Sequence, residues 1–395
     1  MCETSRVFLR WWLVVGSLLL AGVEQLLRAE PPCQHIVLVS VDGLAAQYFT
    51  DPQADLPTLR ALAAQGVRAR GMITSFPSVT WPSHTSLITG THPGRHGVIG
   101  NNAFDRRTQQ EVVYIGDPMR EKHEAIKVPT LYDVAHAGGL SCASVLWPCC
   151  NGADTLRYMI PDTNRAALLQ KYTTPGLPEE LKQAGIDLGK LGEWGWNKEY
   201  SQQRDNLYTD IVIYLLKKYR INLMLVHLIT PDGVEHAKGP FTPEAYEAVK
   251  QSDANLKRIW ETLQEPPFAG RSSLVVVSDH GFAPVERVLR PNVLFKEHGW
   301  IEVDANNRPI KRRVWCVGQG GGAFVYILDE EHKNELLKEV RELLAAQPGV
   351  AEILDISRFA EVGHVPPEEN IESPHLLLAT GPRASLRQWA ERKLE

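Results

Sequence analysis

The chain has 395 residues, a formal net charge of −5, 44% hydrophobic residues and 23% charged residues. These values are typical of a folded globular protein and exclude an intrinsically disordered chain, a collagen-like chain and a polytopic membrane protein. The small negative charge argues against a general nucleic-acid binder, because such a protein needs a basic face. The length fits two or three domains, or one large α/β domain with insertions.

The first 29 residues have the pattern of a targeting segment. An apolar run from Trp11 to Val23 follows Arg6 and Arg10, and a small residue, Ala29, comes shortly after it. The run is shorter than the roughly 20 residues that cross a bilayer, and its basic flank is typical of a secretory signal peptide. We expect a signal peptide or an N-terminal membrane anchor over residues 1–29, and therefore an exported protein that is periplasmic, extracellular or anchored facing outside.

From residue 34 onwards, short apolar runs alternate with amphipathic stretches. In chain order we predict a strand over 36–41, helices over 55–64, 83–89 and 130–137, a strand over 142–147, a helix over 205–219, a strand over 222–229, a helix over 243–263, strands over 274–278 and 324–328, and a helix over 331–346. Near-continuous apolar strands between helices predict a mostly parallel sheet covered on both faces. Residues 189–197 and 302–313 are polar or glycine-rich, and we expect loops or insertions there.

Metal-ligating side chains follow three of the predicted strands. Asp42 ends the first strand, Asp232 and His236 follow the strand over 222–229, and Asp279 and His280 end the strand over 274–278. Ligands gather beyond the carboxyl ends of strands in open α/β sheets, and aspartate and histidine are ligand types that zinc takes. Each position taken alone could be an ordinary turn, but the three together predict a metal site.

A hydroxyl group is predicted close to a helix N-terminus. Pro82 and Ser83 mark a helix start, so we expect Thr80 just ahead of the first turn. Free N–H groups and a partial positive charge favour an anion there, and a hydroxyl beside metal ions can lose its proton and attack phosphorus. Taken alone, Thr80 is more simply explained as an N-cap with a structural role.

Five segments form a recognisable set in the order Val39–Gly43, Phe76–His84, Thr89–Asn101, Pro231–His236 and Ser278–Phe282. Together they resemble the type I phosphodiesterase / nucleotide pyrophosphatase family of the alkaline phosphatase superfamily, and the resemblance covers residues 34 to 382. It implies an alkaline-phosphatase-like α/β catalytic domain over residues 34–395, with a mostly parallel sheet sandwiched between helices. We expect loop insertions near 155–200 and 285–320.

The resemblance also implies two Zn²⁺ ions and a threonine nucleophile, Thr80, that forms a covalent phospho-enzyme intermediate. One ion would be held by Asp42, Thr80, Asp279 and His280, and the other by Asp232, His236 and a histidine near the C-terminus. Two histidines compete for that last role. His364 lies 17 residues before Gly381, at about the family's interval, but lacks the glycine that usually follows; His375 directly precedes the apolar strand that ends at Gly381. We favour His364.

Two further residues are predicted to bind substrate. Ser83 stands where the family often has an asparagine that helps to bind a phosphate oxygen, and its hydroxyl or backbone N–H can still donate. Trp81 can stack on a base or leaving group, although a role in the core fits equally well. His84 and His96 are expected to orient loops rather than to bind a metal.

The function implied is zinc-dependent hydrolysis of phosphodiester or pyrophosphate bonds in a small, nucleotide-like phosphate ester, with no binding of nucleic-acid duplexes. The N-terminal segment is a candidate membrane tether. The nearest alternative is a phosphomonoesterase or phosphonate hydrolase with the same site, because substrate choice depends on pocket shape. The alternative of another class is a non-catalytic metal-binding relative; Thr80 argues against it, while Ser83 and the open choice of the third histidine leave it in contention.

Overall fold

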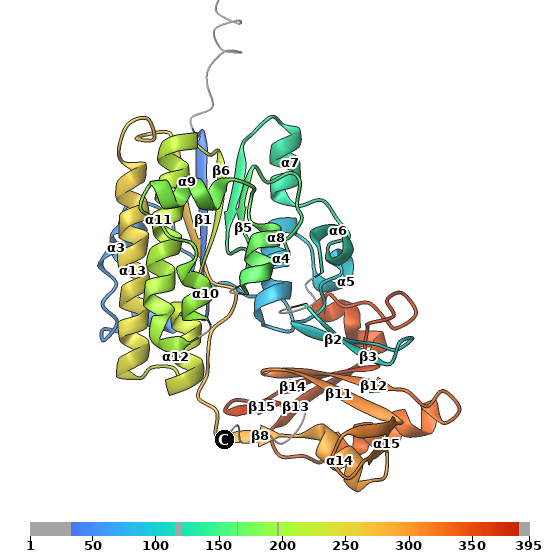
Figure 1. Ribbon diagram of the computed structural model, residues 1–395. Helices are drawn as coiled ribbons and strands as arrows, with labels where there is room; N and C mark the ends of the chain where they lie inside the picture. Colours follow the sequence, from blue (N-terminus) through green and yellow to red (C-terminus); the bar gives the residue numbers. More distant parts are fainter. Residues whose placement is uncertain (1–32, 115–119, 164, 196, 387–395) are drawn as a thin grey trace, which may run out of the picture.

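The larger part of the molecule is built around a five-stranded parallel sheet with the strand order β5-β4-β6-β1-β7 (Figure 1). Its strands are β1 His35–Val41, β4 Cys142–Val145, β5 Tyr158–Ile160, β6 Leu223–Leu228 and β7 Ser272–Val277. The computed structural model describes residues 33–114, 120–163, 165–195 and 197–386. The predicted targeting segment, residues 1–29, therefore lies outside the described residues. Within the described ranges, no helix has the length and apolar character needed to span a bilayer.

Helices cover both faces of this sheet. One face, with Val37, Val39 and Val226, packs against apolar side chains of α9, α11 and α13. The opposite face, with Leu38 and Leu225, belongs to a core that also includes α4, α7 and the C-terminal elements from Phe295 to Leu386. The helices are α2 Ala46–Thr50, α3 Pro57–Gln65, α4 Thr80–Thr89, α5 Pro93–His96, α6 Lys122–Ala125, α7 Leu131–Ala137, α8 Ala166–Tyr172, α9 Leu177–Gln183, α10 Lys190–Trp194, α11 Ser201–Tyr219, α12 Thr230–Lys238 and α13 Pro243–Leu263, with a 3₁₀ turn η1 at Lys198–Tyr200.

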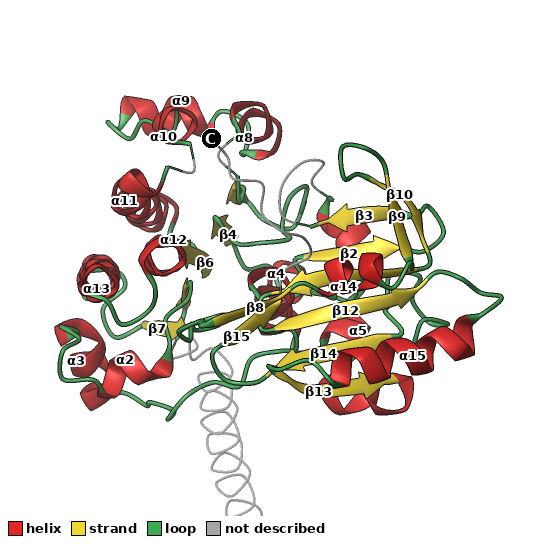
Figure 2. Ribbon diagram, turned by 90° about the horizontal axis from the view of Figure 1, so that it is seen from below, coloured by secondary structure: helices red, strands yellow, loops and turns green. Residues whose placement is uncertain are grey.

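A four-stranded antiparallel sheet forms the second half, with the order β11-β12-β14-β13. Figure 2 shows this sheet beside the helix-covered parallel layer, with α15 packed along it. The elements are β11 Val314–Gln319, β12 Gly322–Ile327, β13 Val350–Asp355, β14 Leu376–Thr380, α14 Pro291–Glu297, α15 Lys333–Ala345 and the 3₁₀ helix η2 Ile356–Val362. Within the described residues, three two-stranded pairs complete the fold: β2 Asn102–Asp105 with β3 Gln110–Val113, β8 Arg287–Leu289 with β15 Ala384–Leu386, and β9 Ile301–Val303 with β10 Pro309–Arg312.

The predicted class, an α/β fold with a parallel sheet between helices, is confirmed, and the helix predicted over 243–263 has the observed bounds. The strand predicted over 324–328 lies instead in the antiparallel sheet, as β12. All six residues of β12 are buried, so its apolar run looks the same in sequence as a buried parallel strand. The expected loops at 189–197 and 302–313 contain the short helix α10 and the β9–β10 hairpin.

Candidate metal centre and nucleophile

The strand order places the predicted ligands at one edge of the parallel sheet. β1 pairs with β6 on one side and β7 on the other, so that Ser40 lies opposite both His227 and Val277. The carboxyl ends of the three strands therefore lie side by side. Asp42 follows β1 directly, and Asp279 follows β7 after one residue; Asp232 lies in the first turn of α12, the helix that follows β6.

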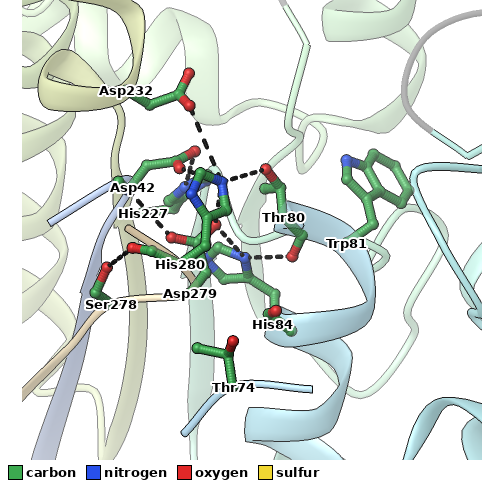
Figure 3. A network of polar contacts seen from close by, with 12 residues as sticks. Asp42, Thr74, Thr80, Trp81, His84, His227, Asp232, Ser278, Asp279 and His280 are labelled. Carbon is green, nitrogen blue, oxygen red and sulfur yellow. Dashed lines mark hydrogen bonds and ion pairs between the residues drawn. The ribbon is translucent and has the colours of Figure 1, made fainter. Parts of the chain in front are cut away.

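His280 lies at the centre of the resulting cluster (Figure 3). Its Nε2 atom is 3.2 Å from Asp42 Oδ1, 3.5 Å from Asp279 Oδ2 and 4.0 Å from Asp232 Oδ1. One ligand atom from each of Asp42, Asp232 and His280 lies within 4.8 Å of the others, a spacing that could hold a metal ion. The structure thus brings together four of the predicted ligands: Asp42, Asp232, Asp279 and His280.

Thr80 faces this cluster from the other side. Its Oγ1 atom is 3.4 Å from His280 Nε2. The helix that carries it, α4, begins at Thr80 with Val79 as the N-cap, three residues earlier than predicted. Pro82 is compatible with this start, because the first N–H groups of a helix have no partner inside it. Thr80 is therefore the first residue of α4 rather than a residue ahead of it.

The electrostatics of the cluster fit a bound cation. Burial, together with the nearby Asp232 and Asp279 carboxylates, raises the pKa of Asp42 well above its ordinary value. Burial also acts to raise the pKa of Asp279, but His280, His84 and His227 outweigh it and lower that pKa. Asp42 Oδ1 and Asp279 Oδ2 are buried and accept no hydrogen bond from the part of the chain that the structure describes. A divalent cation would satisfy both oxygens and offset the repulsion between the carboxylates, and aspartate and histidine are suitable donors for zinc.

The second predicted ligand set is only partly assembled. His236 Nε2 lies 3.2 Å from Asp232 Oδ1, four residues apart on α12. The Phe282 ring meets both His236 and His280 edge-on. In the described part of the chain, neither of the two groups of close ligand atoms includes His236 or a histidine from the C-terminal region.

The two competing C-terminal histidines have different surroundings. His364 is buried among aromatic rings, and its Nε2 lies 2.8 Å from the carbonyl oxygen of Phe76, in the loop that leads to α4. His375 is buried in the antiparallel sheet, where its Nδ1 accepts a hydrogen bond from the backbone of Ile327. Burial lowers the pKa of His364 to about 4 and that of His375 to about 3. Both are therefore neutral imidazoles, but only His364 contacts the segment that leads to Thr80.

The predicted substrate-binding residues lie deeper than the sequence suggested. The Trp81 side chain is fully buried in the core, which favours the core interpretation over a stacking surface for substrate. Ser83 is also buried, and its Oγ lies 3.3 Å from Ser75 Oγ. His96 lies 3.0 Å from Ser86 Oγ through Nε2 and accepts from the backbone of Val98 through Nδ1, which agrees with a loop-orienting role.

Two buried groups beside the cluster were not predicted from the sequence. His227, on β6, has its Nε2 3.0 Å from Asp42 Oδ2. Asp162 follows β5, and burial together with Asp279 raises its pKa to about 7. The available signals were a single histidine within the apolar run Leu223–Leu228, and an aspartate just after a strand, as at Asp42. His84, expected only to orient a loop, forms a second group of close ligand atoms with His227 and Asp279.

This fold is the alkaline-phosphatase-like α/β architecture. It resembles the murine ectonucleotide pyrophosphatase / phosphodiesterase 5, solved as an inactive variant in complex with AMP, with a TM-score of 0.65, 17% identity and coverage of 90% of this chain and 80% of that one. It also resembles phosphonoacetate hydrolase from Sinorhizobium meliloti 1021, solved with phosphonoacetate, with a TM-score of 0.66, 18% identity and coverage of 91% and 84%.

The sequence model of the family Type I phosphodiesterase / nucleotide pyrophosphatase matches residues 36–382. The chain therefore belongs to this family of pyrophosphatase and phosphodiesterase hydrolases. Among similar proteins, the human ectonucleotide pyrophosphatase/phosphodiesterase family member 7 is 25% identical over 281 residues, which are 69% of this chain and 53% of that protein. An uncharacterized pyrophosphatase/phosphodiesterase of Schizosaccharomyces pombe is 26% identical over 249 residues, 63% of this chain and 45% of that protein. The chain spans about half the length of these curated relatives.

Proposed function

We propose that this chain hydrolyses phosphodiester or pyrophosphate bonds in small, nucleotide-like substrates, with Thr80 as the nucleophile and two zinc ions bound at the ends of the strands. The observation that carries the proposal is the position of the Thr80 hydroxyl, 3.4 Å from His280 Nε2 and next to a cluster of three carboxylates. Such a cluster lacks charge balance without cations, and phosphate esters are the anions that a nucleophile beside two cations attacks.

We assign the first ion to Asp42, Thr80, Asp279 and His280, and the second to Asp232, His236 and His364. Ser83 remains a proposed donor to a phosphate oxygen. When bound, the two cations would lower the charge on the reacting phosphate and stabilise the attacking and leaving oxygens.

Thr80 performs the bond changes. Its hydroxyl loses a proton to solvent, and Oγ1 attacks phosphorus while the bond from phosphorus to the leaving oxygen breaks. A water oxygen then attacks the phosphorylated threonine, and the bond from phosphorus to Oγ1 breaks to release the product and restore the hydroxyl. The location of Thr80 at the first position of α4 helps this chemistry, because free N–H groups at a helix start attract the phosphate.

The experiment compares hydrolysis of bis-p-nitrophenyl phosphate and p-nitrophenyl phosphate by the zinc-loaded full chain. We expect faster cleavage of the diester. Thr80→Ala should lower the rate by a factor of about 10³ or more while both zinc ions stay bound, because the aspartate and histidine ligands remain. Thr80→Ser, which keeps a hydroxyl, is the matched control and should retain measurable turnover. A Thr80→Ala variant with a rate close to wild type would rule out the nucleophile.

The same panel separates the alternatives. A preference for the monoester would indicate a phosphomonoesterase, and turnover of phosphonoacetate would indicate a phosphonate hydrolase. If the protein binds stoichiometric zinc but hydrolyses none of these substrates, nucleotide diesters and dinucleotides are tested next. No turnover of those compounds would indicate a non-catalytic relative.

A further inference from the structure

His227 is a buried histidine whose ring nitrogens both face oxygen atoms. It lies one residue before the end of β6, and its side chain is 2% exposed. Nε2 is 3.0 Å from Asp42 Oδ2, and Nδ1 is 3.3 Å from the carbonyl oxygen of Leu146, just after β4. The shorter contact favours a proton on Nε2, donated to Asp42.

This hydrogen bond is made to Oδ2, one of the two carboxylate oxygens of Asp42. The other oxygen, Oδ1, lies 3.2 Å from His280 Nε2, on the side where Asp232 and Thr80 lie (Figure 3). A carboxylate has two equivalent oxygens and can rotate about its bond to Cβ. A donor fixed beside Oδ2 therefore determines that Oδ1 is the oxygen that faces His280.

The His227 ring is itself held in place. The His84 ring packs against it edge-on, with 4.3 Å between the centroids. His84 in turn is fixed within α4, because its Nδ1 lies 2.8 Å from the carbonyl oxygen of Thr80. The two histidines thus connect the helix of the nucleophile to the carboxylate at the end of β1.

We propose that His227 is a positioning residue, which holds the Asp42 carboxylate through a hydrogen bond from Nε2 in the orientation that binds a cation. The inference rests on the proposed function, since it assigns a role to a residue behind the proposed zinc ligands. Partners of this kind, which orient a ligand without touching the metal, typically account for a factor of about 10 to 100 in metal affinity.

A different use of the same residue has to be distinguished. The ligand atoms of His84, His227 and Asp279 lie within 4.8 Å of one another and are buried, so they could also hold an ion of their own. The contacts favour the positioning role, because Nε2 is engaged with Asp42 Oδ2 and Nδ1, the other nitrogen that could ligate, lies 3.3 Å from the carbonyl oxygen of Leu146. The experiment therefore counts the bound ions as well as measuring their affinities.

Two substitutions of His227 test the proposal in the full chain. His227→Leu removes the donor and keeps a similar volume, whereas His227→Gln keeps an amide N–H in about the position of Nε2. The matched control is His35→Leu, on the neighbouring strand β1. His35 is also buried and its Nδ1 lies 2.7 Å from the backbone oxygen of Ile221, but it contacts none of the proposed ligands. Zinc affinities are measured by competition with a chromophoric chelator, and bound ions are counted by native mass spectrometry.

We expect His227→Leu to weaken one of the two zinc ions by about 10- to 100-fold and leave the other unchanged. His227→Gln should recover most of that loss, and His35→Leu should leave both affinities unchanged. Unfolding of the metal-free variants is followed in parallel; if His227→Leu does not fold, the affinity of His227→Gln relative to His227→Ala decides the question.

Three results would overturn the inference. If His227→Leu binds both ions as tightly as wild type, His227 does not position Asp42, and the proposed function stands as long as wild-type turnover depends on Thr80. If wild type binds three ions and His227→Leu loses one, His227 is itself a ligand. If wild type binds no zinc, both this inference and the proposed metal site fail.

Discussion

The close approach of three chain segments at Gly43 gives the sharpest test of how the site is built. Gly43 follows Asp42 directly and has a φ of +76°, in the left-handed region that favours glycine. A Cβ atom at this position would lie 2.8 Å from the Phe282 ring, 3.1 Å from Glu235 Oε2 and 3.2 Å from Asp232 Cα. The Asp232 contact is with backbone, so it cannot be relieved by rotating a side chain. Gly43→Ala should therefore push the Asp42 turn away from the start of α12.

The magnitude follows from comparison with Gly139. That residue has a φ of +79°, but a Cβ there would meet nothing within 4 Å. Both alanine variants incur the cost of a left-handed residue, about 1–2 kcal/mol. Only Gly43→Ala adds the clash and moves ligands. Because a displacement of about 1 Å at a reacting site can cost roughly 100-fold in rate, we expect Gly43→Ala to lose at least 10-fold in zinc affinity and in kcat, and Gly139→Ala to lose neither.

The assay measures the thermal midpoint of the metal-free proteins, the zinc affinities and the diester rate for both variants. Gly43→Ala should also unfold at a lower temperature than Gly139→Ala, since it has the additional clash. Equal zinc affinities and equal rates in the two variants would refute the argument that Gly43 allows β1, α12 and the segment after β7 to form one site.

Two further predictions concern titration and the last ligand. Burial and Asp279 raise the pKa of Asp162 to about 7. The folded state therefore holds the Asp162 proton more tightly than the unfolded chain does. As a result, the free energy of unfolding falls as pH rises from about 4 to about 7. Asp162→Asn should remove that share of the pH dependence, up to about 4 kcal/mol, as measured by chemical denaturation of the metal-free protein. The control Asp154→Asn, at an exposed aspartate, should leave the pH dependence as it is in wild type. Parallel pH profiles for Asp162→Asn and wild type would contradict the prediction. For the last ligand, His364→Ala should lower the zinc content to one ion while His375→Ala keeps two, as measured by atomic emission, and the opposite result would assign His375 instead.

Some features followed from the sequence because they depend on local chemistry. Apolar runs between amphipathic stretches gave the parallel strands β1, β6 and β7, and the aspartates after them followed from the rule that ligands collect at the carboxyl ends of such strands. The motifs were sufficient to indicate the family, which the match over residues 36–382 confirms. These inferences need only the order of residues along the chain.

Other features depend on contacts between distant segments, which local patterns do not record. The run at β12 has the same apolar character as a parallel strand, and only its pairing with β11 and β14 places it in a separate antiparallel sheet. Trp81, next to Thr80 in sequence, is turned into the core by the geometry of α4.

His227, on the short strand β6, shows the difference between what the local sequence indicates and what the tertiary structure decides. The sequence marks it as a histidine in an otherwise apolar run, which is compatible with many roles. Its meaning comes from the parallel register that places Ser40 opposite His227, because that register brings the histidine ring behind the Asp42 carboxylate, 185 residues away in the chain. Sequence by itself therefore determined the family and the candidate side chains, and the tertiary structure decided which of them face one another, since hydrogen bonds and charge interactions act over a few ångströms in space regardless of separation along the chain.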